Sequence, residues 1–372
     1  MRCLMSNNKS LTSAKAKKDD EFYTQLGDIE NELKHYKHYF QNKVVFCNCD
    51  DPYESNFFKY FAMNFNALKL KKLIATSYSG SPVVGKELNC FVEFDKEQKI
   101  QNKVAYKVSM SELKDTNNDG SEDLFDVQEI IKHRIRYLNG DGSFQSEESI
   151  ELLKKADIVV TNPPFSLFRD YLSLLMKYKK KFIVIGNLHA ITYKEVFPWI
   201  KNNEIWLGYN HVSSFKHADG TIKKFGNILW YTNLDIPKRH EKIDLYKSFD
   251  PKEYPKYDNY DAIEVKKVDL IPFDYNGMMG VPISFLEKYS PDQFEIIGFP
   301  TAASNENSLN LNNDYSKYIG YKQNGDKTGR TGSTFGACPV FERNDKKGIY
   351  YSNGERTIQA GSCERIFIRR IN

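Results

Sequence analysis

Short apolar runs alternate with amphipathic stretches through the first 240 residues of the chain. Runs of β-branched and aromatic residues predict buried strands, and apolar positions that recur every three to four residues predict helices. The predicted strands cover residues 43–47, 72–78, 90–94, 104–110, 157–161, 182–185, 205–209 and 227–231. The predicted helices cover residues 20–40, 54–68, 127–138, 146–155, 168–178 and 193–201, the last of them limited by Pro198.

This alternation predicts an α/β fold. We expect a mostly parallel sheet with helices on both faces, closed by an antiparallel pair from the strands at 205–209 and 227–231. Sheets of this kind bind their ligands at the carboxyl ends of the strands. A binding site is therefore expected where several of these strands end.

The regular alternation stops near residue 240, where glycine-rich loops and short β-like runs begin. We predict a flexible tail over 1–18, a catalytic domain over 19–240 with an insertion at 80–139, and a C-terminal region over 241–372. No run of 18 apolar residues occurs, so neither a transmembrane helix nor a membrane partner is expected. The lysine-rich N-terminus lacks the apolar stretch of a secretory signal, which favours a cytoplasmic location.

Six cysteines without a secretory signal favour free thiols in a reducing compartment. Cys47 and Cys49 form a lone Cys-x-Cys, with no second pair of Cys or His at zinc spacing. We therefore expect no metal. Cys338 precedes a proline in a glycine-rich region. The cysteine nucleophiles of enzymes that modify carbon five of cytosine usually follow a proline instead. Cys338 is therefore interpreted as structural.

Net charge is only +4, but its distribution is uneven. Residues 315–372 contain eleven Lys and Arg against five Asp and Glu, while residues 111–126 are acidic. A polyanion would be drawn to the C-terminal part, although ordinary surface variation explains the same excess. The candidate contacts to DNA are Arg330, Arg343, Lys346, Lys347 and Arg356.

The candidate catalytic loop is Asn162-Pro163-Pro164-Phe165, which directly follows a predicted strand. An exocyclic amine such as N6 of adenine is a poor nucleophile because its lone pair is delocalised into the ring. The Asn162 side-chain oxygen and the Pro163 carbonyl can accept its two hydrogens and return electron density to the nitrogen. Two prolines fix the backbone, and Phe165 offers a face on which an extruded base can stack. A strand-ending turn is the alternative interpretation.

Polar residues near two other predicted elements are candidates for binding a cofactor. Asn48, Asp50 and Asp51 follow the first strand, and Ser55 opens the next helix; an N-cap role for the acids explains the pattern equally well. Tyr23 and Thr24 could cover and bind the cofactor, or simply begin a helix. Asp141 and Phe144 lie in a Gly-Asp-Gly-Ser-Phe turn that could meet an adenine ring or could be only a turn.

Together these segments resemble the EcoRI-type adenine-specific DNA methyltransferases. The likeness rests above all on Phe22-Tyr23-Thr24, on the particular run Val45-Phe46-Cys47-Asn48-Cys49-Asp50-Asp51-Pro52, on Gly140-Asp141-Gly142, and on residues 157–168, and it covers roughly 20–372. It implies a Rossmann-like class I methyltransferase fold with a C-terminal target-recognition region. It also implies S-adenosylmethionine as donor, S-adenosylhomocysteine as product, N6 of adenine in double-stranded DNA as target, and a restriction endonuclease as genetic partner in many relatives.

Three departures weaken the cofactor assignments. The loop after the first strand has Tyr53-Glu54-Ser55 where most methyltransferases have Gly-x-Gly, the second strand ends without an acid for the ribose, and Ser143 stands where an Asp is common before Phe144. Two other functions stay open: an amino-methyltransferase acting on RNA or on a protein glutamine amide, and a non-catalytic DNA-binding protein. We expect a monomer, because one extruded base needs one site.

Overall fold

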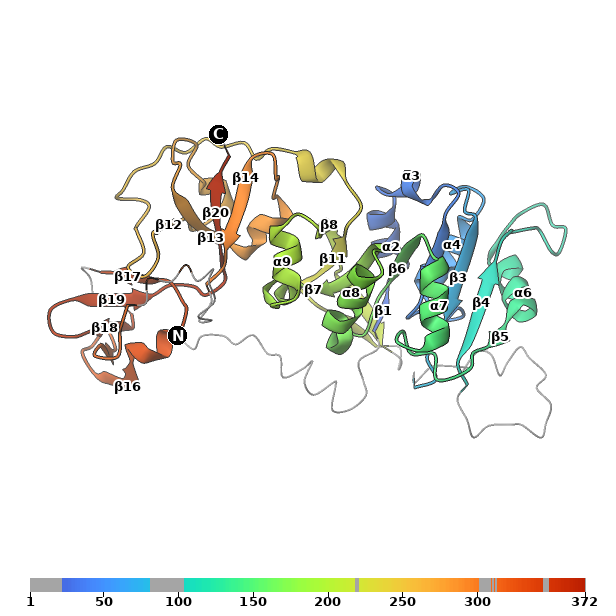
Figure 1. Cartoon of the computed structure of the whole chain (residues 1–372), viewed down its shortest axis with the longest axis horizontal. Helices are drawn as coiled ribbons and strands as arrows, with labels where there is room; N and C mark the ends of the chain where they lie inside the picture. Colours follow the sequence, from blue (N-terminus) through green and yellow to red (C-terminus); the bar gives the residue numbers. More distant parts are fainter. Residues whose placement is uncertain are drawn as a thin grey trace. The chain divides into compact units, whose positions relative to one another are not determined.

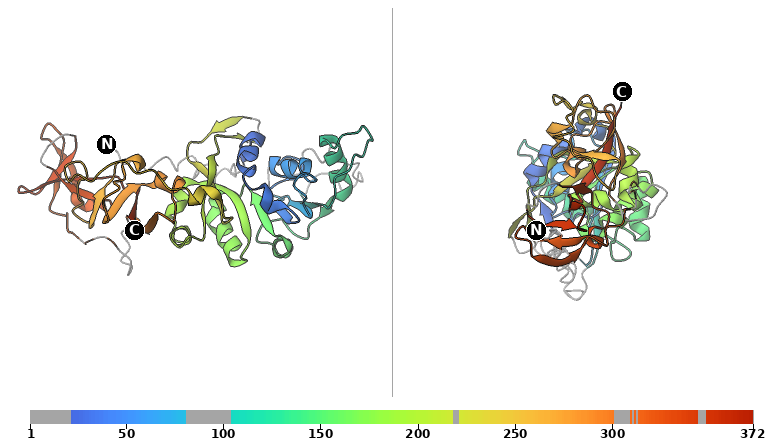
Figure 2. Two further views of the ribbon diagram at one scale, coloured as in Figure 1. Left: turned by 90° about the horizontal axis from the view of Figure 1, so that it is seen from above. Right: turned by 90° about the vertical axis from the view of Figure 1, so that its left-hand side faces the viewer.

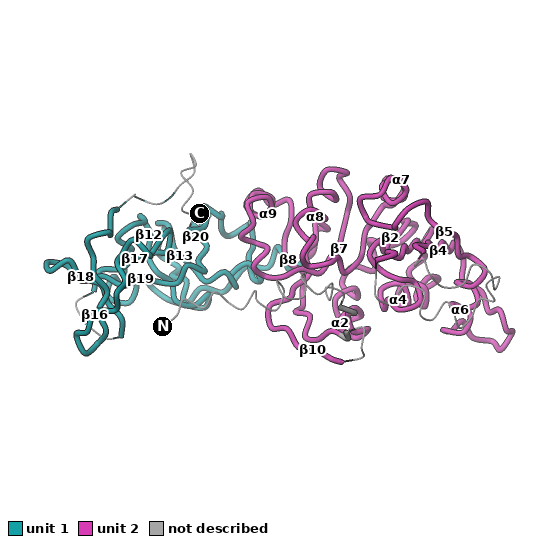
Figure 3. The backbone as a smooth tube through the Cα atoms, turned by 90° about the horizontal axis from the view of Figure 1, so that it is seen from below, with its two compact units in different colours: residues 1–4, 237–372 teal, residues 5–236 magenta. Residues whose placement is uncertain are grey.

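The computed structural model describes residues 22–80, 104–217, 221–300, 309, 311, 313–343 and 348–371. The chain forms two compact units that divide between Ile236 and Pro237 (Figure 3). Among the described residues, no helix has the length and apolar character needed to cross a bilayer.

An eight-stranded sheet forms the centre of the larger unit (Figure 1), with the strand order β5-β4-β3-β2-β6-β7-β11-β8. The four central strands run parallel, and the strands outside them pair in antiparallel fashion. The strands are β2 (Val44–Cys47), β3 (Lys72–Thr76), β4 (Tyr106–Met110), β5 (Arg136–Tyr137), β6 (Ile158–Thr161), β7 (Lys181–Asn187), β8 (Trp206–His211) and β11 (Ile228–Thr232).

Helices cover both faces of this sheet. In Figure 3, α7, α8 and α9 lie on one face and α2, α4 and α6 on the other, and the left view of Figure 2 agrees for the blue and green helices. The four central strands are buried along most of their length, as a sheet covered on two faces requires. The helices are α2 (Leu26–Leu33), α3 (Lys37–Phe40), α4 (Asn56–Met63), α6 (Leu124–Arg134), α7 (Glu147–Lys155), α8 (Phe168–Lys177) and α9 (Val196–Lys201).

The alternation of strands and helices is confirmed as a mixed α/β architecture, including the closing antiparallel pair β11 and β8. The expectation of a mostly parallel sheet is wrong at one edge, because β4 and β5 add antiparallel pairings beside β3. Hydrophobic periodicity identifies a buried strand but does not fix its direction. The predicted strand at 90–94 lies outside the described residues.

The predicted helix over 20–40 is also wrong in part. Phe22–Thr24 forms β1, which pairs with β9 (Ser214–His217), and β10 (Ile222–Lys224) completes this three-stranded sheet. Helical structure then follows in two pieces, α2 and α3. Strand pairing between segments almost 200 residues apart leaves no signal in local periodicity, whereas the apolar residues of α2 do show the helical spacing.

Local signals explain where several helices begin. Ser146 caps α7 and accepts a hydrogen bond from the Ser149 N–H at 3.3 Å. Asp123 and Asp126 form a capping box at α6, so this helix starts three residues before the predicted start at 127. Pro198 falls in the first turn of α9, where a missing N–H costs nothing, so the proline does not break the helix.

The smaller unit, from Pro237 onward, contains two further sheets. The first has the order β12-β13-β20-β14, from β12 (Ala262–Glu264), β13 (Met278–Pro282), β20 (Arg365–Arg370) and β14 (Phe294–Gly298). The second has the order β16-β15-β18-β19-β17, from β16 (Lys327–Thr331), β15 (Ile319–Tyr321), β18 (Tyr350–Ser352), β19 (Thr357–Ala360) and β17 (Val340–Glu342).

A disulfide joins Cys338 to Cys363 in this unit, with the two Cα atoms 4.5 Å apart. The expectation that every cysteine is a free thiol is therefore wrong for this pair, whereas neither Cys47 nor Cys49 forms a disulfide. The spacing of 25 residues gave no sign of the pairing, because the fold alone brings the two positions together. Cys338 does have the structural role expected of it.

Candidate active site

A pocket lies at the carboxyl ends of β2, β3 and β6, at the edge of the sheet where the sequence predicts a site. The loop after β2, the loop after β6, the first residues of α4 and the turn before α7 form its wall. The residues that line it are Thr24, Asn48, Cys49, Asp50, Asp51, Ser55, Asn56, Phe57, Tyr78, Gly142, Ser143, Phe144, Asn162, Pro163, Pro164 and Leu167. The structure thus brings together most of the predicted catalytic and cofactor residues.

The Asn-Pro-Pro-Phe loop contributes three residues to the pocket wall. Asn162, Pro163 and Pro164 line the pocket, whereas Phe165 begins a 3₁₀ turn and is only 9% exposed. The Phe165 ring packs edge-on against Phe215 of β9, with the ring centroids 5.8 Å apart. A base that stacks on Phe165 has to compete with this packing, and the stacking role stays a prediction.

Asp50 connects the loop after β2 to the loop after β6. One oxygen of its buried carboxylate accepts a hydrogen bond from the Ser55 hydroxyl at 2.7 Å, and the other accepts one from the Thr161 hydroxyl. The backbone N–H of Asn162 also donates to this carboxylate. Burial raises the pKa of Asp50 to about 7, while its hydrogen bonds act in the opposite direction. Asp50 therefore holds the backbone at the start of the Asn-Pro-Pro-Phe loop.

Asp51 is held by the first residue of β4 and by its own loop. Both of its oxygens lie 2.7 Å from the Tyr106 hydroxyl, and the backbone N–H of Tyr53 donates to one of them at 3.0 Å. Burial raises the pKa of Asp51 to about 6. The cap of α4 is Ser55, whose hydroxyl accepts from the Phe57 N–H at 3.0 Å, so the N-cap interpretation of the two acids is wrong.

Two buried residues of the wall carry a polar atom without a hydrogen-bond partner in the described part of the chain. These atoms are Thr24 Oγ1 and Asn48 Nδ2, on residues that are 3% and 2% exposed. Tyr171 of α8 donates its hydroxyl proton to Asn48 Oδ1, which fixes the orientation of the amide. An unpaired buried polar atom costs about 1–3 kcal/mol, so these two atoms favour a polar ligand in the pocket. The side chain of Tyr23 lies outside the described set.

The turn before α7 needs glycine at one position. Gly142 has a φ of +74°, and a Cβ there would clash with the carbonyl oxygen of Ser77. Phe144 packs edge-on against Tyr171 with centroids 5.1 Å apart, which places its ring in the pocket wall. Asp141 is exposed next to the wall, and its carboxylate accepts from the Ser143 N–H at 2.9 Å. A contact between Asp141 and the cofactor stays a prediction.

Comparison with known proteins shows the family of the chain. The sequence profile described as "Adenine-specific methyltransferase EcoRI" matches residues 10–340. The chain belongs to the EcoRI family of adenine-specific methyltransferases. It is 48% identical over 327 residues to the Type II methyltransferase M.EcoRI of Escherichia coli, covering 82% of this chain and 94% of the relative.

Two relatives from mycoplasmas are more distant members. The Type II methyltransferase M.MgeORF184P of Mycoplasma genitalium is 38% identical over 306 residues, covering 76% of this chain and 84% of the relative. The Type II methyltransferase M.MpnI of Mycoplasma pneumoniae is 36% identical over 305 residues, covering 76% and 83%. No solved structure matches the chain.

Several pocket residues of this adenine-specific methyltransferase were missed by sequence reasoning. Tyr78 follows β3 and lines the pocket although it is 45% exposed, and Asn56 donates from its side chain to the Thr24 carbonyl at 2.7 Å. Tyr78 could have been found, because it follows the second parallel strand and ligands bind at the carboxyl ends of such strands. The Asn56–Thr24 contact depends on the pairing of β1 with β9, which the sequence does not reveal.

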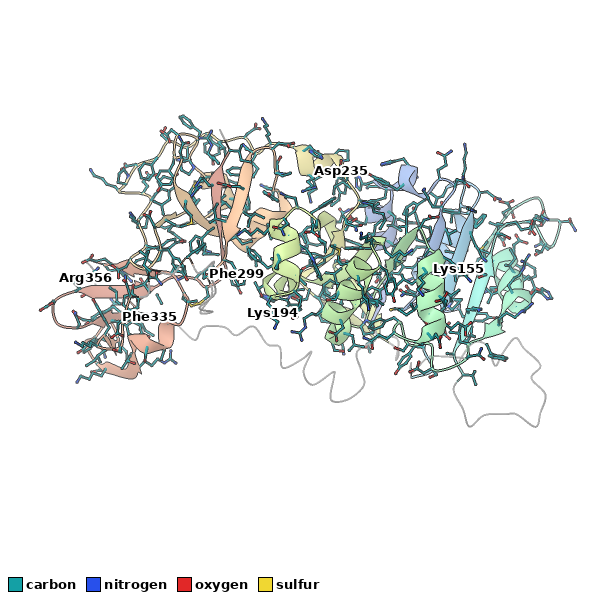
Figure 4. All side chains as sticks on the ribbon, viewed as in Figure 1. Lys155, Lys194, Asp235, Phe299, Phe335 and Arg356 are labelled. Carbon is teal, nitrogen blue, oxygen red and sulfur yellow. A yellow bond between two sulfur atoms is a disulfide. The ribbon has the colours of Figure 1, made fainter. Side chains whose placement is uncertain are left out.

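The candidate DNA contacts of the methyltransferase have unequal surroundings. Arg330 is exposed on β16. Arg356, which is labelled in Figure 4, binds Asp258 at 2.7 Å and Glu342 at 3.0 Å. Arg343 donates to the Gln359 side chain and is half-buried. Lys346 and Lys347 lie outside the described residues. Of the three arginines described, Arg330 is the one whose charge is most open to a polyanion.

Proposed function

We propose that this enzyme is a site-specific DNA methyltransferase that transfers the methyl group of S-adenosylmethionine to N6 of adenine in duplex DNA. The observation that carries the proposal is the position of Asn162 and Pro163 in the wall of one pocket that also contains the residues after β2. Membership of an adenine-specific family favours this target over a protein glutamine amide and favours an enzyme over a non-catalytic protein.

The residues of the chain act on the amine by accepting its hydrogens. The Asn162 side-chain oxygen and the Pro163 carbonyl draw N6 toward tetrahedral geometry, which makes its lone pair available. The Asp50 carboxylate accepts a hydrogen bond from the Asn162 N–H. This bond fixes the loop before the base binds. The base reaches the loop by leaving the duplex, because N6 inside the stack is inaccessible to a pocket of this kind.

The pocket residues fit S-adenosylmethionine, which supplies the methyl group on a sulfonium. Its amino acid and ribose parts are polar and need donors and acceptors. Thr24 Oγ1 and Asn48 Nδ2 are available for this, while Phe144 and Tyr78 offer aromatic surface for its adenine ring. Asp50, Asp51 and Ser55 belong to the same wall, but their side chains are held mainly by protein partners. We therefore assign direct contacts first to Thr24 and Asn48.

The names of the relatives support a role in restriction and modification. Three of them are named Type II methyltransferases. We infer that this enzyme is the modification component of a restriction-modification system, with the nuclease as a genetic partner. The basic excess of residues 315–372 supports a target-recognition function for the C-terminal region.

The test is the substitution Asn162→Ala. Methyl transfer to plasmid DNA should fall by at least about 100-fold, because one of the two acceptors for N6 is lost. Binding of S-adenosylmethionine, measured by calorimetry, should change little. The control is Asn202→Ala, since Asn202 is an exposed residue of the same unit outside the pocket. Digestion of the product to nucleosides and sequencing identify the base and site, and full activity of Asn162→Ala would refute the proposed mechanism.

A further inference from the structure

The three-stranded sheet β1-β9-β10 lies directly beside the catalytic loop. Phe215 of β9 contacts the Phe165 ring, and Thr24 of β1 lines the pocket. β10 pairs with β9 and forms the outer edge of this sheet. None of the sequence motifs considered above falls on β10, so the edge strand has no assigned role in the proposed function.

One row of side chains crosses this sheet from the pocket to its edge. Thr24 lies opposite Phe215, and Phe215 lies opposite Lys223. Residues directly opposite each other in antiparallel strands project from the same face, and neighbouring strands are about 5 Å apart. Lys223 therefore projects from the face that carries the pocket residue and the contact to the catalytic loop. Its neighbour Lys224 projects from the other face, because side chains alternate along a strand.

The surroundings of Lys223 suit a polyanion. All three residues of β10 are exposed, including the apolar Ile222 at 64%. Residues 211–225 contain three lysines and two histidines against one acid, Asp219. Lys223 lies on the exposed edge of a sheet whose first strand contributes Thr24 to the pocket wall. A base extruded into the pocket stays joined to the duplex through its backbone, so a phosphate of that backbone can reach this edge. The flexible four-carbon stem of lysine suits a contact with a phosphate.

We propose that Lys223 binds a backbone phosphate next to the target adenine, and that β10 is a DNA-contacting strand of the catalytic unit. The inference rests on the proposed function, since it takes the substrate to be duplex DNA. It adds a contact from the catalytic unit itself, one that holds the target nucleotide at the mouth of the pocket. Because the contact is to phosphate, it carries no sequence information.

The test compares Lys223→Ala with Lys224→Ala, a matched control one residue away on the opposite face of the same strand. The substrate is a duplex oligonucleotide that contains the site mapped for the wild-type enzyme. Lys223→Ala should raise Kd and KM for this duplex roughly tenfold at moderate salt and reduce the slope of log K against log salt by about one. Lys224→Ala should change both much less. Binding of S-adenosylmethionine should be the same in all three proteins.

A second substrate locates the contact. An uncharged methylphosphonate on either side of the target adenine should weaken binding by the wild type and leave Lys223→Ala unaffected, while Lys223→Arg should restore most of the affinity. Equal effects of the two alanine substitutions, or equal losses from the methylphosphonate in wild type and Lys223→Ala, would overturn the inference while leaving the proposed function intact. If the wild-type enzyme methylates no adenine in DNA, both fail.

Discussion

The loops at the strand ends of the larger unit and the basic surface of the smaller unit were both predicted as functional regions, but on different grounds. The loop residues were predicted from their position after parallel strands, and the structure brings them into one pocket. The basic residues were predicted from charge alone, and their side chains have different environments: Arg356 binds two acids while Arg330 is exposed.

This difference shows which kind of sequence evidence predicts a site. The carboxyl ends of adjacent parallel strands must meet at one edge of the sheet. Residues that directly follow such strands are therefore brought close together by the fold. A charge count contains no such constraint. Acidic neighbours that are distant in sequence, such as Asp258 for Arg356, decide whether a cation is available to a ligand. Three measurements test this contrast between the two regions.

The largest effect is expected for Asp50→Ala. Its removal leaves Ser55, Thr161 and the Asn162 N–H without their shared acceptor, so the catalytic loop loses its support. The turnover number should fall by about 100-fold, the cost of a misplaced catalytic group. The matched control is Asp258→Ala, which removes a carboxylate with several donors from the smaller unit and should leave the affinity for S-adenosylmethionine unchanged. Equal losses of turnover in the two variants would remove the distinction between the regions.

The second effect concerns pH and tests how deeply the pocket acids are buried. The folded-state pKa of Asp50 is raised to about 7, whereas an unfolded Asp titrates near its ordinary value. Between about pH 4 and 7 the folded state therefore holds a proton that the unfolded state has released. The free energy of unfolding should fall as pH rises through this window, by up to about 1.4 kcal/mol per pH unit from this group.

Denaturant titrations of the cofactor-free enzyme at several pH values measure this slope. Asp50→Asn should reduce it, because the amide does not titrate, and Asp51→Asn should reduce it over a window that ends near pH 6. Asp258 provides the contrast, because hydrogen bonds and the charge of Arg356 lower its pKa. A slope that survives both pocket substitutions would show that these two acids are not its source.

The smallest effects are expected for the arginines of the smaller unit. Arg356→Met should lower the stability of this unit by about 1 kcal/mol, because its ion pairs are partly exposed, and it should change DNA binding little. Arg330→Met should do the reverse, leaving stability unchanged and reducing the salt slope of DNA binding by about one. Thermal unfolding and binding at several salt concentrations give both values. If Arg356→Met weakened DNA binding and Arg330→Met did not, the availability of a charge in the structure would not predict which arginine contacts DNA.

Sequence reasoning found the central strands, most helices and the two loops that carry the pocket, because buried strands and amphipathic helices leave local periodic patterns. It did not find β1, since the pairing of Thr24 with Phe215 joins segments 191 residues apart. For the same reason it missed the contact of Phe165 with Phe215. The Cys338–Cys363 disulfide likewise depends on proximity that only the folded chain creates.

The place of β20 in its sheet has a consequence for how the protein is made. β20 lies between β13 and β14, yet both neighbours precede it in the chain by more than 60 residues. During translation, β13 and β14 leave the ribosome before β20 is synthesised. Until β20 pairs with them, each has an edge with unpaired backbone groups. Unpaired strand edges invite pairing with other chains. Translation that stalls or terminates before Arg365 should therefore produce an aggregation-prone fragment instead of a shortened but folded C-terminal unit.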